Sequence, residues 1–365
     1  MKTLKNNYFT PSQICLIFLA VVPVTKLVSM PSFLTMSANR SLWISAIICF
    51  VLDLLLFIFM ALACKKFDCT FFEALEKTFG KTWAKVVMGV FAIFFFIKAL
   101  YPILEERYFI ENTFYEEITT DFIFYPFFAL CFYLCFKGLK ALERTSFLLA
   151  LFSVIGVVLT FILTYKESEI AKLLPLFQES PKQILGGSLN SLLFCGEGVY
   201  LLFFMGRTDN NKKLVLPLTF TLIGGYIAVI ALFVAFYGVF GEVSMTKIFS
   251  LSQMSHYSLI LSNIGRLDSL ACFLIDFARL FAIAFPLILC VECCRYIFGE
   301  KLRVTLISSG VVVMLSLIFV IVFNEKVVYT FNMINKLFRF FLLPINFILP
   351  FFVFTLRGKN EKLRN

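Results

Sequence analysis

The stretch that decides the fold is residues 11–34, with the sequence PSQICLIFLAVVPVTKLVSMPSFL. It is apolar and long enough for a helix that crosses the hydrocarbon core, which takes about 20 residues. Proline removes a backbone donor and clashes with the preceding turn, so Pro23 and Pro31 predict an interrupted helix. Lys26 lies between these prolines. Because an ionisable side chain is costly in lipid, it should face the protein interior.

The composition of the whole chain agrees with a membrane protein. Of the 365 residues, 60% are hydrophobic and 15% are charged, and the mean hydropathy is +0.91. A soluble domain averages about 25% charged residues. The net charge of +10 is distributed over short polar connections, and no long basic tract indicates nucleic acid as a partner. The composition therefore predicts a lipid bilayer as the surrounding medium.

Ten apolar runs predict an all-α integral membrane protein with ten transmembrane helices. A shorter segment, residues 70–81, alternates aromatic and charged residues at helical spacing, which predicts an interfacial helix lying along the bilayer. The ten expected spans cover residues 11–34, 41–63, 83–104, 122–136, 146–165, 184–205, 214–240, 267–291, 304–323 and 333–356.

The sixth run is also interrupted at its middle, where Gly196 and Gly198 flank Glu197. Ten spans can form two sets of five, and many transporters have inverted repeats whose first helices are broken at mid-membrane. The pattern therefore predicts one membrane domain with a 5+5 inverted-repeat, LeuT/APC-like fold and broken helices 1 and 6. Repeat one would cover about 10–165 and repeat two about 184–356, followed by a tail at 357–365. The alternative is an ordinary proline kink and a glycine packing contact.

Lys26 and Glu197 are the most informative charged residues, since each lies in an interrupted segment. We expect them to form a buried charge pair. The candidate ligand-binding residues are Val24, Thr25, Lys26, Ser29, Gly196, Glu197, Gly198 and Tyr200. For Thr25 and Ser29 the alternative is a hydrogen bond to the preceding turn, and for Tyr200 it is a place in the core or at the lipid interface.

Other ionisable residues within the runs have simpler expected roles. Asp276 and Arg279 are three residues apart on one helix and should satisfy each other. Asp53 and Lys98 should pair with neighbours or line the interior. Lys336 and Arg339 should reach the outer interface by extending their side chains.

The distribution of Lys and Arg predicts the orientation. These residues are more than twice as frequent in the connections on the N-terminal side of the runs as in the opposite connections. Both termini should therefore be cytoplasmic. The acidic stretch 105–121 is then expected outside, as a solvated loop, a cation-attracting vestibule or a partner contact.

No catalytic constellation stands out in the sequence, so an enzyme is not expected. The single histidine, His256, lies in a connection. Close cysteines suggest metal only weakly, because no paired CxxC set is present. We predict no cofactor and no metal site, and assign the cysteines to the core. The close cysteines are Cys131 with Cys135, and Cys290 with Cys293 and Cys294.

A series of short motifs resembles the GerAB-type subunits of spore germinant receptors, a family related to amino-acid permeases of the APC superfamily. Each motif is short, and the specificity lies in their order along essentially the whole chain. They are Thr10-Pro11-Ser12-Gln13, Met30-Pro31, Phe71-Phe72-Glu73-Ala74-Leu75, Phe79-Gly80-Lys81, Gly138-Leu139-Lys140-Ala141-Leu142-Glu143-Arg144, Leu173-Leu174-Pro175, Phe194-Cys195-Gly196-Glu197 and Arg266-Leu267-Asp268.

The resemblance implies a subunit that binds a small germinant, commonly an amino acid. It also implies two partner subunits, a larger membrane subunit and a lipoprotein, in the inner membrane of a dormant bacterial spore. One departure concerns the first helix break, where the family usually has glycine and this chain has none before Gly80. Lys26 occupies that region instead. A proton- or ion-coupled amino-acid or amine permease and a non-binding membrane scaffold are the alternative functions.

Overall fold

The computed structural model describes residues 9–66, 69–114, 120–175, 179–208, 213–256 and 267–323, together with Met333, Ile334, Lys336 and Pro344. The expected tenth span at 333–356 lies outside the described residues apart from those four. Arg339 and the tail at 357–365 lie outside them as well. Within the described part the chain is helical, and its one β feature is an isolated bridge between Phe9 and Thr208.

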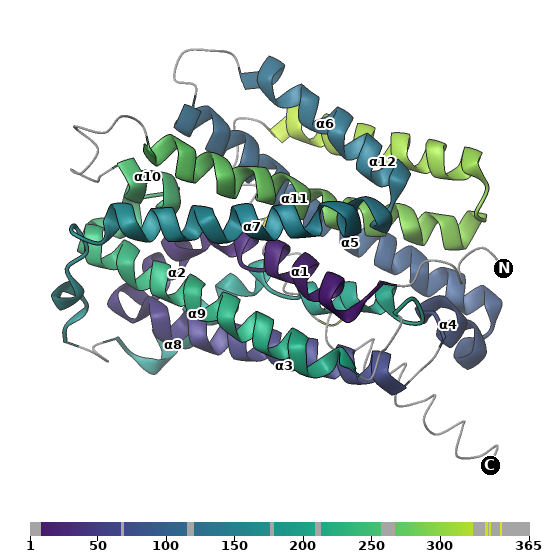
Figure 1. The fold of residues 1–365 in the computed structure, drawn as a ribbon, viewed down its shortest axis with the longest axis horizontal. Helices are drawn as coiled ribbons and strands as arrows, with labels where there is room; N and C mark the ends of the chain where they lie inside the picture. Colours follow the sequence, from purple (N-terminus) through teal and green to yellow (C-terminus); the bar gives the residue numbers. More distant parts are fainter. Residues whose placement is uncertain are drawn as a thin grey trace.

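The helices are arranged as a bundle in which most long elements run along the same axis (Figure 1). Helices α6 and α12 lie together along one edge, while α4 and α10 lie at opposite ends (Figure 1). The elements are α1 (Pro11–Val21), η2 (Val24–Lys26), α2 (Met30–Ala38), η3 (Asn39–Ser41), α3 (Leu42–Lys66), α4 (Phe71–Phe79), α5 (Lys81–Phe114), α6 (Thr120–Lys137), α7 (Leu139–Thr164), η4 (Ile170–Leu173), α8 (Pro181–Asn190), η5 (Ser191–Phe194), η6 (Glu197–Phe204), α9 (Val215–Phe240), η8 (Gly241–Thr246), α10 (Ser250–His256), α11 (Leu267–Phe298) and α12 (Leu302–Phe323).

Seven stretches of the described chain are long and apolar enough to cross a membrane, which supports a multi-pass membrane protein. Two shorter apolar helices, Pro11–Lys26 and Phe124–Lys137, accompany them. The seven stretches are Met30–Lys65, Lys81–Glu111, Leu139–Thr164, Pro181–Phe204, Val215–Thr246, Asp268–Phe298 and Leu302–Phe323.

Helix α11 is the central helix of the bundle. In the most apolar part of α11, 83% of the residues are buried inside the protein, whereas in that of α12 only 28% are. It packs most extensively against α5 and α7. Helices such as α12 leave large apolar side chains outside the protein, where a lipid environment is needed to cover them.

The first helix is interrupted where the prolines predict. Helix α1 begins with a capping box, in which the side chains of Thr10 and Gln13 each accept from the other's backbone N–H. It ends at Val21, and a single tight turn follows, in which Lys26 N–H donates to Pro23 O at 3.0 Å. Regular helix resumes only at Met30, so residues 22–29 form the first break.

The sixth expected span is interrupted as well, at Cys195 and Gly196. Helix α8 begins with Ser180 as its cap and passes into the 3₁₀ turn η5. Gly196 then has a φ of 93°, in the left-handed region that residues other than glycine rarely adopt. Glu197 starts the next 3₁₀ segment directly after this turn. Both interruptions therefore expose backbone groups in the interior of the bundle.

Helix α4 confirms the separate amphipathic helix expected at residues 70–81. Thr70 and Glu73 form its capping box, and Gly80 ends it with a φ of 83°. Phe71 and Leu75 are buried, and Phe71 stacks edge-on against Phe91 of α5 at 5.5 Å between ring centroids. The apolar face of α4 thus packs on the protein.

The expectation of a solvated loop from residue 105 is wrong for its first part. Helix α5 continues to Phe114, and Glu105 and Glu106 are buried with 3% and 0% of their surface exposed. Residues 105–114 include neither proline nor glycine, so no helix-breaking residue ends the helix at Leu104. The prediction was based on the charge of this stretch, but the two glutamates are buried beside a cationic partner on α11, Arg279.

We predict that Gly206→Ala destabilises the fold strongly. Gly206 has a φ of 71°, and an added Cβ would lie 2.6 Å from Cys69 C and 2.7 Å from Thr70 N. The left-handed conformation alone costs about 1–2 kcal/mol for an L-residue, and the backbone clash adds to it. Thermal unfolding of the purified protein should show a lower Tm.

Gly224→Ala is the matched control for this substitution. Gly224 lies within α9, and an added Cβ would meet nothing within 4 Å. Alanine there should be neutral or stabilising by up to about 1 kcal/mol. Equal melting temperatures for the two variants would contradict the described packing of α4 against residue 206.

Candidate functional site

The two helix breaks meet in the interior of the bundle through an ion pair. Lys26 Nζ lies 2.9 Å from Glu197 Oε2, and it also donates to Val22 O at 3.2 Å. Lys26 is 0% exposed and Glu197 is 2% exposed. The residues that the sequence singled out as a charge pair are therefore brought together, 171 positions apart in the chain.

Two further charged residues complete this group. Asp53 of α3 lies 3.7 Å from Lys26 Nζ, and Lys98 of α5 lies 3.8 Å from Glu197 Oε1. We call Lys26, Asp53, Lys98 and Glu197 the central charge cluster. It holds two cations and two anions, so its charge is balanced without any other group. Such compensation is what an interior of low dielectric constant requires.

The central charge cluster also satisfies the unwound backbone of the second break. Gly196 N–H donates to Asp53 Oδ1 at 2.8 Å, and Lys98 Nζ donates to Cys195 O. Backbone without regular hydrogen bonds is tolerated at membrane depth only where the protein or a cavity satisfies it. Asp53 and Lys98 therefore stabilise the unwound backbone of the second break as well as balancing charge.

Tyr226 of α9 closes one side of the cluster. Its hydroxyl donates to Asp53 Oδ2 at 2.7 Å, and its ring stacks on Phe50 at 4.7 Å between centroids. Lys26 Nζ lies 5.9 Å from the centroid of the same ring. Gly225 lies against Pro23, where an added Cβ would come within 2.9 Å of Pro23 Cγ. This close approach brings α9 next to the first break.

The remaining candidate residues do not all join the cluster. Thr25 Oγ1 donates to Val22 O at 3.0 Å, which is the bond to the preceding turn that the sequence left open. Ser29 contacts Tyr101 at 3.0 Å and Glu105, away from the central charge cluster. Val24 is fully buried in the apolar core.

Gly198 and Tyr200 take part in packing on η6. An added Cβ on Gly198 would lie 2.9 Å from Leu56 Cγ, so the glycine allows close approach to α3. The Tyr200 ring is buried between Phe95, at 5.7 Å, and Phe285, at 4.9 Å. Of the eight candidates, Lys26 and Glu197 thus belong to the central charge cluster, and Gly196 donates a hydrogen bond to it.

Sequence reasoning noted Asp53 and Lys98 as interior charges but did not place them at the site. The available signal was their charge within an apolar run. For Tyr226 the only signal is its position after Gly224 and Gly225, and that pattern does not specify a partner. Which helices meet at the breaks had to come from the structure.

The expected mutual pairing of Asp276 and Arg279 holds only in part, because the two charges attract each other but the ion pairs of Arg279 within 4 Å among the described residues are made with α5. Arg279 forms ion pairs with two residues of α5 instead, with Glu105 and, at 2.7 Å, with Glu106. An i,i+3 neighbour offers one carboxylate, whereas the packing of α5 against α11 brings two. Arg279 is 1% exposed, so these contacts lie in the interior.

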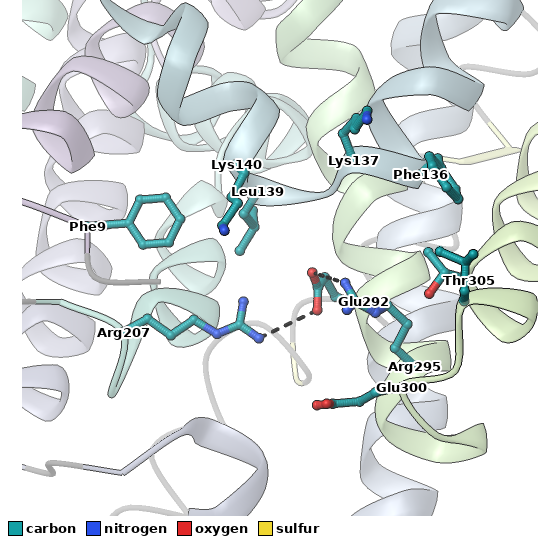
Figure 2. A pocket seen from close by; sticks show the side chains of 11 residues that line it. Phe9, Phe136, Lys137, Leu139, Lys140, Arg207, Glu292, Arg295, Glu300 and Thr305 are labelled. Carbon is teal, nitrogen blue, oxygen red and sulfur yellow. Dashed lines mark hydrogen bonds and ion pairs between the residues drawn. The ribbon is translucent and has the colours of Figure 1, made fainter. Parts of the chain in front are cut away.

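A polar pocket of about 300 Å³ lies apart from the central charge cluster, at the end of the bundle where α6 meets α7 (Figure 2). Arg207 and Arg295 both turn towards Glu292 there, at 3.6 Å and 3.0 Å (Figure 2). Arg207 also donates to Tyr296 OH at 2.9 Å. Since both guanidinium groups are engaged by protein, this pocket is a structural junction in the described state.

No group of three or more His, Cys, Asp or Glu side chains within the described ranges is arranged to hold a metal ion. In the central charge cluster the two carboxylates are already paired with two ammonium groups. Its chemistry suits a ligand that carries both charges.

We predict that Lys26→Met and Glu197→Gln are each strongly destabilising. Each leaves the central charge cluster with one uncompensated charge, and breaking a buried pair costs about 3–5 kcal/mol. The double variant restores the balance and should recover a large part of the loss. Thermal unfolding of the three variants measures the coupling.

The exposed pair between Arg40 and Glu242, 2.7 Å apart, supplies the control. Glu242 is 66% exposed, so Glu242→Gln should cost less than about 1 kcal/mol. Additive losses in the double variant of Lys26 and Glu197 would show that the two residues are not coupled.

Comparison with known proteins identifies a family for this chain. Residues 9–328 match a family model described as spore germination protein, and the matched part includes both breaks and the whole central charge cluster. No curated protein matches the chain. The match confirms the family resemblance that the motifs suggested, and the chain belongs to the spore germination protein family.

Proposed function

We propose that this protein is the nutrient-sensing subunit of a spore germinant receptor, and that it binds a small molecule, an amino acid, between the two helix breaks. Membership of the spore germination protein family supports a germination role in a membrane. The proposal includes a ten-helix, 5+5 inverted-repeat fold with cytoplasmic termini. It also includes the inner membrane of the spore as location, and a larger membrane subunit and a lipoprotein as partners.

The observation that carries the proposal is the pairing of two breaks through a balanced charge cluster. A free amino acid carries one carboxylate and one ammonium group. Inserted between Lys26 and Glu197, its carboxylate would pair with Lys26 and its ammonium with Glu197, while Asp53 stays beside Lys26 and Lys98 stays beside Glu197. The number of opposite charges stays balanced, so a zwitterion can enter where a singly charged ligand would leave an unpaired charge.

The described state, with Lys26 and Glu197 in direct contact at 2.9 Å, is then the ligand-free closed state. A bound zwitterion separates the pair and favours a state in which the two breaks are further apart. A ligand shifts an equilibrium only by its differential affinity for the two states. Reversing a 99:1 preference takes about 5.5 kcal/mol of such difference. Partner subunits that contact the moving helices would receive this shift.

A proton- or ion-coupled amino-acid or amine permease is the alternative. The ionisable groups at mid-membrane favour it, because such groups mark ion and proton pathways in transporters. Both functions use the same central site. Uptake of labelled amino acid by the chain alone in vesicles would support the permease.

We predict that the purified protein is stabilised by a small set of amino acids in a thermal-shift screen. A ligand at 100 times its Kd adds about 2.7 kcal/mol to the free energy of unfolding. Analogues that lack the carboxylate or the amino group should stabilise less, since each leaves one pole of the central charge cluster unpaired.

The Lys26→Met/Glu197→Gln double variant is the test variant, because its charge remains balanced. It should fold and lose the response to the amino acid. A variant of the exposed pair, Arg40→Met/Glu242→Gln, should keep the response. A response that survives in the Lys26 and Glu197 double variant would place the ligand elsewhere. No response from any amino acid in a well-folded preparation would contradict binding by this chain alone.

A further inference from the structure

A second buried charged group lies next to the first break and is not used in the proposed ligand site. It consists of Glu105 and Glu106 on α5 with Asp276 and Arg279 on α11, and we call it the acidic cluster. These residues are 3%, 0%, 7% and 1% exposed, respectively. Three carboxyl groups therefore share one guanidinium group in the interior of the bundle.

Arg279 is occupied by the two glutamates. One of its terminal nitrogens contacts Glu105, and the other lies 2.7 Å from Glu106 Oε2. Glu105 also accepts from Ser29 of the first break. Arg279 can balance one of the three carboxylates, so the fully ionised cluster would hold an excess of two negative charges.

The excess charge falls on Glu106 and Asp276. Neither oxygen of Glu106 accepts a well-formed hydrogen bond, and Asp276 Oδ1 has no partner among the described residues. Both carboxyl groups lie at Arg279, since Glu106 Oε2 is 2.7 Å from its Nη1 and Asp276 lies three residues before it on α11, and the two groups act on each other electrostatically. Two ionised carboxylates offer only acceptors to each other and repel. A carboxylic acid facing a carboxylate supplies the donor that this arrangement lacks.

Among the described residues, Arg279 is the cation that acts on Glu106 and Asp276. On α5, Glu105 and the buried Arg107 flank Glu106 in the sequence, Arg107 has interactions of its own, and Tyr101 contacts Ser29. From α11, the charged neighbour is Arg279, and Cys272 lies one turn before Asp276. Ser255 of α10 contacts Cys272 at 3.3 Å. Each of these groups is neutral, acidic or already paired.

We propose that Glu106 and Asp276 form a proton-binding site inside the membrane, in which one proton is shared between the two carboxyl groups. The proton comes from water and forms one O–H bond, so the step needs no other reactant. Ser29 of the first break donates to Glu105, the residue before Glu106, and Lys26, three residues before Ser29, belongs to the central charge cluster. A movement of the first break would thus reach both groups. The site does not depend on the proposed germinant.

Infrared spectroscopy of the full-length protein in lipid bilayers tests this proposal. At neutral pH the wild-type protein should show the C=O stretch of a protonated carboxyl group, with a shift to lower frequency in D₂O. Glu106→Gln and Asp276→Asn should each abolish the band, because an amide replaces the acid and the remaining carboxylate keeps a donor. For the same reason both variants should fold. Asp276→Asn should melt close to wild type, whereas Glu106→Gln should melt somewhat lower, because Glu106 is also a partner of Arg279.

Glu105→Gln is the matched control on the neighbouring residue. It should keep the band and lower the melting temperature, since it removes a partner of Arg279. If that variant does not fold, Tyr101→Phe serves as the control and should also keep the band. The Lys26→Met/Glu197→Gln double variant should keep the band while losing the amino-acid response, which separates this proposal from the proposed function. Absence of the band from folded wild-type protein, or its persistence in both Glu106→Gln and Asp276→Asn, would overturn the proton-binding site.

Discussion

The structure depends on one interaction, the ion pair between Lys26 and Glu197 at the meeting point of two broken helices. An isolated lysine or glutamate would be costly at this depth, and an unwound helix would leave backbone groups unsatisfied. The pair, with Asp53 and Lys98, meets both requirements at once, since Asp53 accepts from Gly196 N–H and Lys98 donates to Cys195 O. The charged side chains therefore satisfy the unwound backbone, and they also neutralise one another.

The same physical constraint explains how much of the fold could be predicted. Apolar length predicted the seven described stretches that are long and apolar enough to cross a membrane. Pro23 and Gly196 identified the breaks. Both signals act locally along the chain. The cost of buried charge also led to the pairing of Lys26 with Glu197. The prediction failed for Glu105 and Glu106, which were expected in a solvated loop. Their burial depends on Arg279, a partner 174 and 173 positions away, and no local pattern carries that information.

The candidate site shows a similar division. Gly196 and the two charges of the pair contact the cluster, whereas Thr25, Gly198 and Tyr200 serve local bonding or packing. Which candidates contact the cluster depends on the path of the backbone and on side-chain direction, and neither can be derived from helical spacing in an irregular segment. Tyr226 was missed for the opposite reason, since an aromatic residue in an apolar helix is ordinary until its partner, Asp53, is known.

The central claim is that an amino acid separates Lys26 from Glu197 and binds between them. Solid-state NMR can measure it directly, as the dipolar coupling between ¹⁵N-labelled lysine side chains and the ¹³C-labelled carboxylate of an amino acid that stabilises the protein. The account predicts a coupling at ion-pair distance that disappears in Lys26→Met/Glu197→Gln. A bound ligand without coupling to any lysine nitrogen, with the Lys26–Glu197 contact intact, would contradict it.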